Sequence, residues 1–278
     1  MRIFAGFSCK ANINMVKWIQ KVICMKPGLV SVSFRALTPE EIIALCVRSG
    51  LRGVEWGGDV HVPCGDLDTA RRVGDLTRDI GLEVACYGSY CRLTDEEARA
   101  GALDKTLETA VALGAPLIRV WAGPRGSAEA SEAQRAEVAG NARKLADMAA
   151  RAGLDIAFEY HGRTLTDDAD SAMRLLKAVD RKNAGCLWQP PVDMPAGDCL
   201  RAIETVSPYI RNVHVFSWAG VDRLPLAAGE EKWRALLPRL ERLPGERWLL
   251  LEFVRDDDPE QLLADAATLH GWLGGIDR

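Results

Sequence analysis

Short apolar runs rich in β-branched residues alternate with longer amphipathic segments along most of this chain. The runs occupy residues 29–33, 53–56, 83–87, 117–121, 156–160, 185–188, 212–216 and 248–253. Runs of this length are typical of buried strands, and the segments between them are long enough for helices. The pattern therefore predicts eight strands, each followed by a helix.

Single residues also indicate where helices begin and end. Thr38 precedes Pro39 and Glu41, an order typical of a capped helix start. The acidic residues 256–258 before Pro259 likewise predict the start of the last helix rather than a binding site. Glycines suited to helix ends stand at Gly50, Gly81, Gly114 and Gly153.

A repeated strand and helix unit predicts a parallel sheet, and eight such units close into a single (β/α)8 TIM barrel. An open doubly wound sheet is the alternative. It usually has a phosphate-binding glycine motif after its first strand, and residues 33–36 contain no glycine. We therefore expect one barrel domain over residues 25–278. Residues 1–24 are interpreted as an extension outside the fold, consistent with an upstream start.

Composition and charge limit the kinds of molecule that this protein is expected to bind. The 278 residues carry a formal net charge of −4 without a basic stripe, which argues against nucleic acid. No apolar run approaches the roughly 20 residues that span a bilayer, and Lys10, Lys17 and Lys21 interrupt any signal-peptide core. The eight cysteines contain no CxxC pair, so we expect reduced thiols. These features predict a cytoplasmic protein with a small-molecule substrate and no membrane partner, and they are compatible with a homo-oligomer.

Four polar residues interrupt apolar strands at the predicted carboxyl ends of strands five to eight. They are Glu159, Gln189, His214 and Glu252. These ends meet at the mouth of a TIM barrel, and burying unpaired carboxylates there is costly unless a cation compensates. The set predicts one divalent metal ion, with Mn²⁺ or Mg²⁺ favoured by the oxygen ligands and Co²⁺ or Zn²⁺ as alternatives. A purely structural network of ion pairs is the competing interpretation.

Other residues near the predicted strand ends are candidates for substrate binding. Aromatic faces pack against the apolar face of a sugar, and histidine or arginine can bind hydroxyl, carboxylate or phosphate groups. Packing at the barrel rim and exposed ion pairs are the structural alternatives. The candidates are His61, Trp121, His161, Trp188 and Arg223.

The order and spacing of several segments resemble a known family. The segments are residues 53–63 (GVEWGGDVHVP), 158–161 (FEYH), 212–216 (NVHVF) and 251–253 (LEF). Over about residues 25–273 the chain resembles the sugar phosphate isomerase/epimerase family of xylose isomerase-like TIM barrels, in a superfamily that includes the family-2 AP endonucleases. The resemblance implies a metal held by Glu, Asp, His and Glu from strands five to eight. Glu159, His214 and Glu252 match that pattern.

Two positions depart from the family pattern. Gln189 stands where the family usually has Asp, so the ligands carry two formal negative charges rather than three. Ketose epimerases of the family usually have a substrate-contacting His shortly after that Asp, whereas this chain has Val192 and Asp193. The family's substrates are therefore not transferred to this chain.

The resemblance implies a metal-dependent isomerase or epimerase that acts on a ketose or related keto-polyol, phosphorylated or not, through an enediolate. Glu159 and Glu252 would be the catalytic base and acid on opposite faces of the substrate. A lyase of the 3-dehydroshikimate or inosose dehydratase type is one alternative, because residues 159–167 resemble the former. A barrel that binds a sugar without catalysis is another. The four histidines are too few for a three-zinc endonuclease site.

Deleting residues 1–24 should leave the melting temperature and the metal affinity unchanged within error, because the strand and helix pattern begins only after this segment. Thermal denaturation and Mn²⁺ titration of both forms check this expectation. A large loss of stability would show that the segment packs against the barrel.

Overall fold

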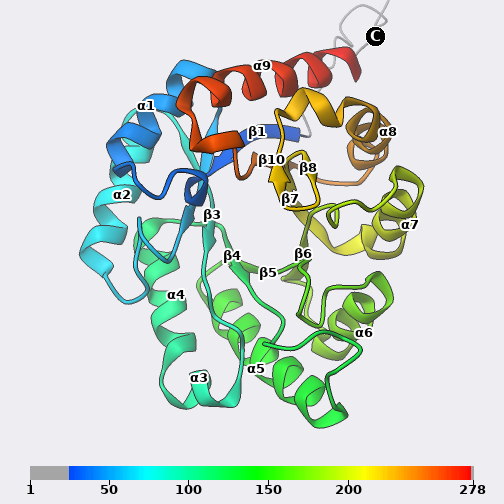
Figure 1. Cartoon of the computed structure of the whole chain (residues 1–278). Helices are drawn as coiled ribbons and strands as arrows, with labels where there is room; N and C mark the ends of the chain where they lie inside the picture. Colours follow the sequence, from blue (N-terminus) through cyan, green and yellow to red (C-terminus); the bar gives the residue numbers. More distant parts are fainter. Residues whose placement is uncertain (1–24, 277–278) are drawn as a thin grey trace, which may run out of the picture.

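Eight parallel strands form a closed barrel in the computed structural model, which describes residues 25–276 (Figure 1). Neighbouring strands in the sequence pair with each other, and β10 closes the ring against β1. The strands are β1 (Met25–Val30), β2 (Gly53–Gly57), β3 (Glu83–Gly88), β4 (Leu117–Val120), β5 (Asp155–Glu159), β6 (Ala184–Trp188), β7 (Ile210–Val215) and β10 (Arg247–Leu251). The expected TIM barrel is confirmed. The extension expected over residues 1–24 lies outside the described residues.

The first strand begins earlier than the apolar pattern predicts. β1 starts at Met25 and ends at Val30, and residues 31–34 form a short 3₁₀ turn. Pro27 does not interrupt the strand, because its carbonyl still accepts a 2.9 Å hydrogen bond from the backbone of Arg52. Gly28 is required by packing, since a Cβ there would lie 2.7 Å from the carbonyl oxygen of Gly53.

Helices surround the strands, and their ends follow the expected signals. Thr38 and Glu41 form a capping box at the start of the first helix, and Asp258 accepts a hydrogen bond from the backbone of Glu260 at the start of the last. The four expected glycines have positive φ angles at helix ends. The helices are α1 (Pro39–Ser49), α2 (Leu67–Asp79), α3 (Asp95–Arg99), α4 (Ala102–Leu113), α5 (Glu132–Arg151), α6 (Ala169–Val179), α7 (Ala196–Val206), α8 (Glu230–Glu241) and α9 (Pro259–Ile276).

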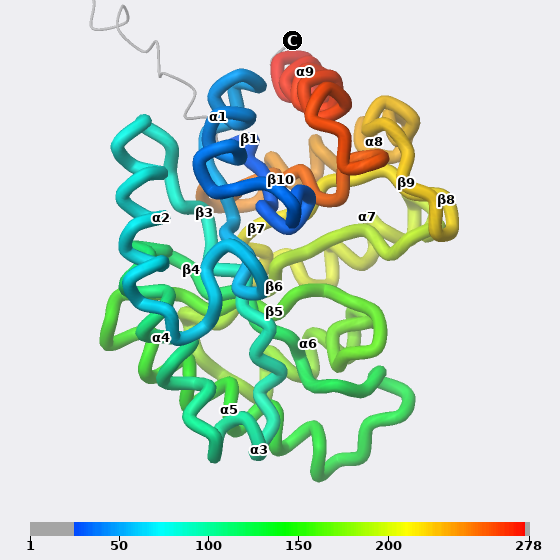
Figure 2. The backbone as a smooth tube through the Cα atoms, turned by 60° about the vertical axis from the view of Figure 1, so that its left-hand side comes forward, coloured from blue at the N-terminus to red at the C-terminus, as the bar shows by residue number. Residues whose placement is uncertain are grey.

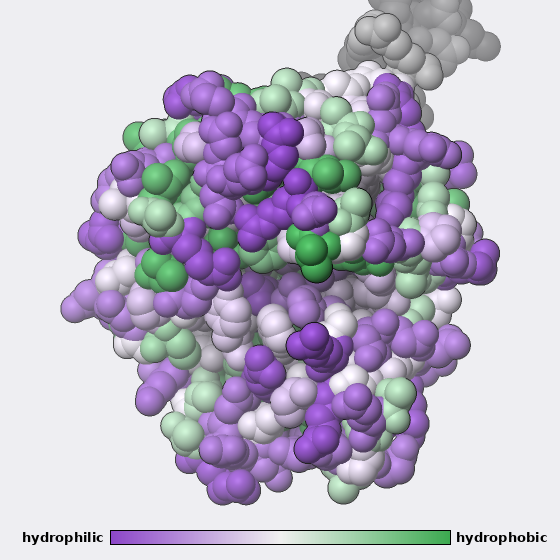
Figure 3. Space-filling view, viewed as in Figure 1, coloured by the Kyte–Doolittle hydropathy of each residue, from purple (hydrophilic) through white to green (hydrophobic). Residues whose placement is uncertain are grey.

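The first and last helices complete the outer ring. α9 packs against α1, so the first and last helices of the described chain lie side by side (Figures 1 and 2). On the face drawn in Figure 3, hydrophobic residues form small separate patches among hydrophilic ones, as expected for a helical shell in contact with water. No helix in the described part of the chain is long and apolar enough to cross a membrane. The cysteines described are free thiols, and most are buried, as expected.

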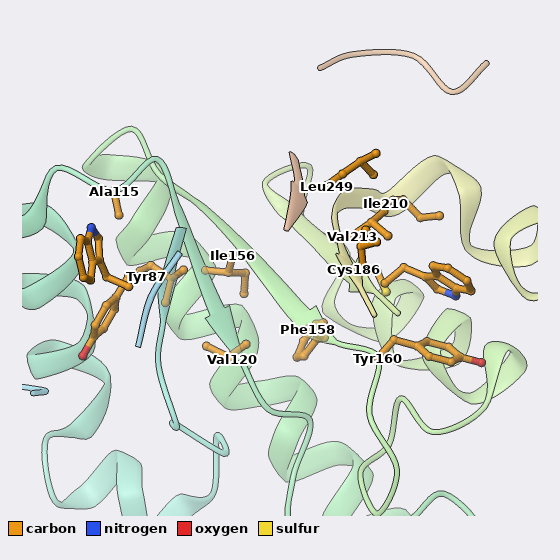
Figure 4. Close-up of a cluster of buried hydrophobic side chains, with 14 of the residues drawn as sticks. Tyr87, Ala115, Val120, Ile156, Phe158, Tyr160, Cys186, Ile210, Val213 and Leu249 are labelled. Carbon is orange, nitrogen blue, oxygen red and sulfur yellow. The ribbon is translucent and has the colours of Figure 1, made fainter. Parts of the chain in front are cut away.

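Alternation along each strand separates the interior into two layers. Outward-facing residues such as Val120, Ile156 and Phe158 pack in the large apolar cluster beneath the helices (Figure 4). Inward-facing residues such as Ala157 and Leu187 form a smaller cluster inside the barrel. The inward positions at the carboxyl ends of several strands are polar, and these positions build the candidate site.

Candidate metal centre

Six polar side chains gather inside the barrel at the carboxyl ends of its strands. Each occupies an inward position that alternates with residues facing the helices. All are buried, with at most 9% of their surface exposed. They are Glu55 on β2, Arg119 on β4, Glu159 on β5, Gln189 after β6, His214 on β7 and Glu252 after β10.

The imidazole of His214 lies at the centre of this group. Its Nδ1 is 2.9 Å from Oε1 of Gln189, 3.3 Å from Oε2 of Glu252 and 3.9 Å from Oε1 of Glu159. The structure thus brings together the four residues that the sequence predicts as metal ligands. They come from four consecutive strands of the barrel wall.

The spacing and chemistry of these atoms fit one divalent ion. Ligand atoms bonded at right angles at about 2.1 Å lie about 3 Å apart. One donor atom from each of Glu159, His214 and Glu252 lies within 4.8 Å of the other two. Small side-chain rotations would bring these donors to a common ion, whose charge would balance the two carboxylates. The amide oxygen of Gln189 would add a neutral ligand.

Two further buried side chains connect the candidate ligands. Oε2 of Glu55 is 3.2 Å from Nε2 of His214. Arg119 donates from Nε to Oε1 of Glu55 at 3.1 Å and from Nη1 to Oε2 of Glu159 at 2.9 Å. Neither residue was among those predicted for the site from the sequence. The available signal was the one used for Glu159, namely a charged residue within a buried strand.

Burial and neighbouring charges set the protonation of the centre. Burial alone would lower the pKa of His214, but the carboxylates of Glu252 and Glu55 raise it to about 10. Burial would raise the pKa of Glu55, but His214 and Arg119 lower it to about 2. The metal-free imidazole therefore carries protons on both nitrogens near neutral pH, and each proton faces a side-chain oxygen.

A second histidine lies at the mouth of the barrel, two residues beyond Glu159. The ring of His161 stacks on Trp121 with a centroid distance of 4.6 Å, and the guanidinium of Arg92 lies 4.9 Å from the same indole ring. Nδ1 of His161 donates to the carbonyl oxygen of Gly162 at 2.7 Å. Because a carbonyl can only accept, Nδ1 carries the proton in this contact, and Nε2 is the nitrogen that can hold a lone pair.

The other predicted substrate-binding residues occupy different surroundings. His61 is 4% exposed, and its Nε2 donates to the carbonyl oxygen of Leu37 at 3.1 Å. Trp188 is fully buried in the layer between strands and helices, because it precedes Gln189 and faces the opposite way. Neither side chain faces the mouth as the sequence analysis expected, and a substrate role for them stays a prediction.

Arg223 contacts the ring of Phe253, which directly follows the candidate ligand Glu252. It belongs to the short strand β9 (Asp222–Arg223), which pairs with β8 (Trp218–Ala219). Its guanidinium is 4.8 Å from the ring of Phe253, the residue after Glu252, and it forms a 2.5 Å ion pair with Asp257. A contact with substrate at this rim stays a prediction.

A cavity of about 330 Å³ lies beside the segments that follow β6 and β7. Pro190, directly after Gln189, and Phe216, two residues after His214, form part of its wall. Val192 and Asp193, which follow in this segment, also line it.

The family model for xylose isomerase-like TIM barrels matches residues 43–273. The chain belongs to this family. The match covers most of the barrel and all six residues of the buried polar group. The resemblance inferred from the sequence is therefore confirmed.

A curated relative, the 3-dehydroshikimate dehydratase of Bacillus anthracis, is 24% identical over 253 residues, which are 84% of this chain and 88% of that protein. A solved probable 3-DHS dehydratase from the same organism has a TM-score of 0.73 at 22% identity, covering 88% of this chain and 99% of that one.

Two other solved structures share the fold. D-psicose 3-epimerase from Clostridium cellulolyticum H10, solved with D-tagatose, has a TM-score of 0.68 at 15% identity and covers 91% of this chain and 99% of that one. A xylose isomerase-like TIM barrel protein from Mycobacterium smegmatis, in complex with magnesium, has a TM-score of 0.65 at 14% identity, covering 87% and 91%. At identities this low, the structural similarity shows the shared barrel fold alone.

Metal affinity should rise with pH, because an ion bound to Nδ1 must displace the proton of His214. The pKa of that imidazole is raised to about 10, so binding at lower pH should release about one proton. The apparent association constant for Mn²⁺ should then increase about tenfold per pH unit between about pH 6.5 and 8.5. Calorimetric titrations in buffers of different ionisation enthalpy measure both quantities, and a pH-independent affinity would contradict the assignment.

Gln189→Asp should bind Mn²⁺ more tightly than the wild type, because it adds a negative charge beside the ion. Gln189→Asn is the matched control, since Asn and Asp have the same size and differ in charge. Titration of the three proteins at fixed pH and salt makes the comparison. Equal affinities of the Asp and Asn variants would remove residue 189 from the neighbourhood of the ion.

Proposed function

We propose that this protein is a metal-dependent lyase that removes water from a polyhydroxylated keto compound. The observation that carries the proposal is the geometry of His161. Its ring is held by the stack on Trp121 and by the hydrogen bond from Nδ1 to Gly162, which leaves Nε2 as a proton acceptor at the mouth. Removal of a proton from the carbon next to a carbonyl needs a proton acceptor of this kind.

The ion would be held by Glu159, Gln189, His214 and Glu252. A divalent cation in this place supplies Lewis-acid chemistry, because it polarises a carbonyl oxygen and thereby acidifies the neighbouring C–H bond. The magnesium complex of a solved relative supports this use of a metal. The cavity beside Gln189 offers room for the rest of the substrate.

Elimination follows from two proton transfers by His161, one from the substrate and one back to its leaving group. Nε2 takes the α-proton, and the electrons of the broken C–H bond pass through an enolate into a new C=C bond. The C–O bond of the β-hydroxyl breaks with its electron pair. His161 returns the proton to the departing hydroxide, which leaves as water. The imidazole ends in its starting state, as a catalyst must.

The proposal differs from the epimerase expected from the sequence in the choice of base. Both carboxylate oxygens of Glu159 are engaged, with Oε2 on Arg119 and Oε1 facing His214. The segment after β6 has Val192 and Asp193, and no histidine, where the ketose epimerases usually have one. The curated dehydratase relative supports the lyase assignment at the level of overall sequence.

An isomerase or epimerase is the second candidate, and one observation favours it. Glu252 and His161 follow β10 and β5, which lie on different sides of the barrel wall. Two proton-transfer groups that approach a substrate from different sides can remove a proton from one face and return it to the other. The solved epimerase relatives share this fold.

The two candidates can be separated with the Mn²⁺-loaded protein, using 3-dehydroshikimate and a panel of ketoses as substrates. A lyase should raise the ultraviolet absorbance of a conjugated product, whereas an epimerase should change the chromatographic profile at constant absorbance. His161→Gln should lower kcat by about 10²–10⁴-fold and leave Mn²⁺ affinity unchanged.

His270→Gln is the matched control, because His270 is exposed on α9 and contacts only the backbone of Ser49 among its described hydrogen bonds. It should retain full activity. Full activity of His161→Gln would contradict the assigned base. Stoichiometric Mn²⁺ without turnover of any substrate would favour a barrel that binds sugar without catalysis.

A further inference from the structure

Glu55 is a buried carboxylate with both oxygens engaged. Its side chain is fully inaccessible to solvent. Oε2 faces Nε2 of His214 at 3.2 Å, and Oε1 accepts from Nε of Arg119 at 3.1 Å. The barrel makes room for this arrangement at Gly88 on β3, where a Cβ would lie 2.8 Å from both Oε1 of Glu55 and Nη2 of Arg119.

The contact with Glu55 determines which nitrogen of His214 is available to a metal. A carboxylate oxygen accepts, so Nε2 keeps its proton and points at Glu55. Nδ1 points at the oxygens of Gln189 and Glu252. Once Nδ1 loses its proton, its lone pair is directed at the position of the ion. A carboxylate behind the ring also makes a histidine a stronger ligand.

The contact between Glu55 and His214 also adds negative charge near the place where an ion would bind. Gln189 contributes no charge, so Glu159 and Glu252 are the anionic ligands. Arg119 reduces the charge of Glu159 by binding its Oε2 at 2.9 Å. Glu55 is a third carboxylate, in contact with Nε2 of His214. It would lie one imidazole ring away from an ion bound to Nδ1.

We propose that Glu55 is a positioning residue that supplies, through His214, the negative charge that this chain lacks at position 189. The inference rests on the metal site of the proposed function. A purely structural Glu55 would neutralise Arg119 and affect folding, but it would not change the affinity of the folded protein for an ion. Metal affinity therefore separates the two roles.

Glu55→Gln should bind Mn²⁺ about 10–100-fold more weakly than the wild type, as expected when a carboxylate behind a metal-bound histidine is lost. Glu83→Gln is the matched control. Glu83 begins β3 at the other end of the barrel, where its partly exposed carboxylate pairs with Lys26 at 3.0 Å. This variant should bind Mn²⁺ like the wild type. Calorimetric titration at fixed pH and salt measures all three proteins.

The double variant Glu55→Gln with Gln189→Asp distinguishes lost charge from damaged structure. If Glu55 supplies the charge that is missing at residue 189, the gain in affinity from Gln189→Asp should be larger in the Glu55→Gln background than in the wild type. If the single variant does not fold, Glu55→Asp serves instead. That variant keeps the charge but draws the carboxylate away from Nε2, and it should weaken Mn²⁺ binding by a smaller factor.

Wild-type affinity in folded Glu55→Gln, or in Glu55→Asp where that variant is used, would overturn the inference and leave the proposed metal site intact. An equal gain from Gln189→Asp in both backgrounds would also overturn it, because Glu55 and residue 189 would then act independently. Failure of the wild type to bind Mn²⁺ would instead overturn the proposed function.

Discussion

Three carboxylates face one another inside the barrel, and the need to balance their charge away from water governs the rest of the site. Glu55, Glu159 and Glu252 are at most 6% exposed, so water cannot screen their repulsion. Arg119 and His214 lie between them and provide one permanent positive charge and one that depends on protonation. A divalent cation in place of the imidazole proton would complete the balance.

The alternation of side chains along a strand explains how much of this site could be predicted from the sequence. Glu159, Gln189, His214 and Glu252 stand at the ends of consecutive strands, so a parallel barrel brings them together whatever its details. Trp188 was grouped with the mouth by its nearness to a strand end. It precedes Gln189, so its side chain faces the helices and its position follows from the same alternation.

Glu55 and Arg119 were harder to assign because their partners are distant in the chain. Glu55 is separated by 159 residues from His214, and only closure of the barrel brings β2 and β7 to the same interior. The strand pattern predicted that closure but not which inward side chains meet across it. The early start of β1 escaped prediction for a related reason, since Pro27 and Gly28 suit the strand only through their contacts with Arg52 and Gly53.

The buried network also bears on the kind of reaction the site can support. Arg119 donates to Oε2 of Glu159, and Oε1 of Glu159 faces Nδ1 of His214. This carboxylate therefore has little capacity left to accept a substrate proton. If Glu159 holds an ion as proposed, the contacts that orient it as a ligand would also make it a poor base. Proton transfer in the proposed reaction would then need a group outside the network, and His161, which follows β5 and stacks on Trp121, is the imidazole proposed for it.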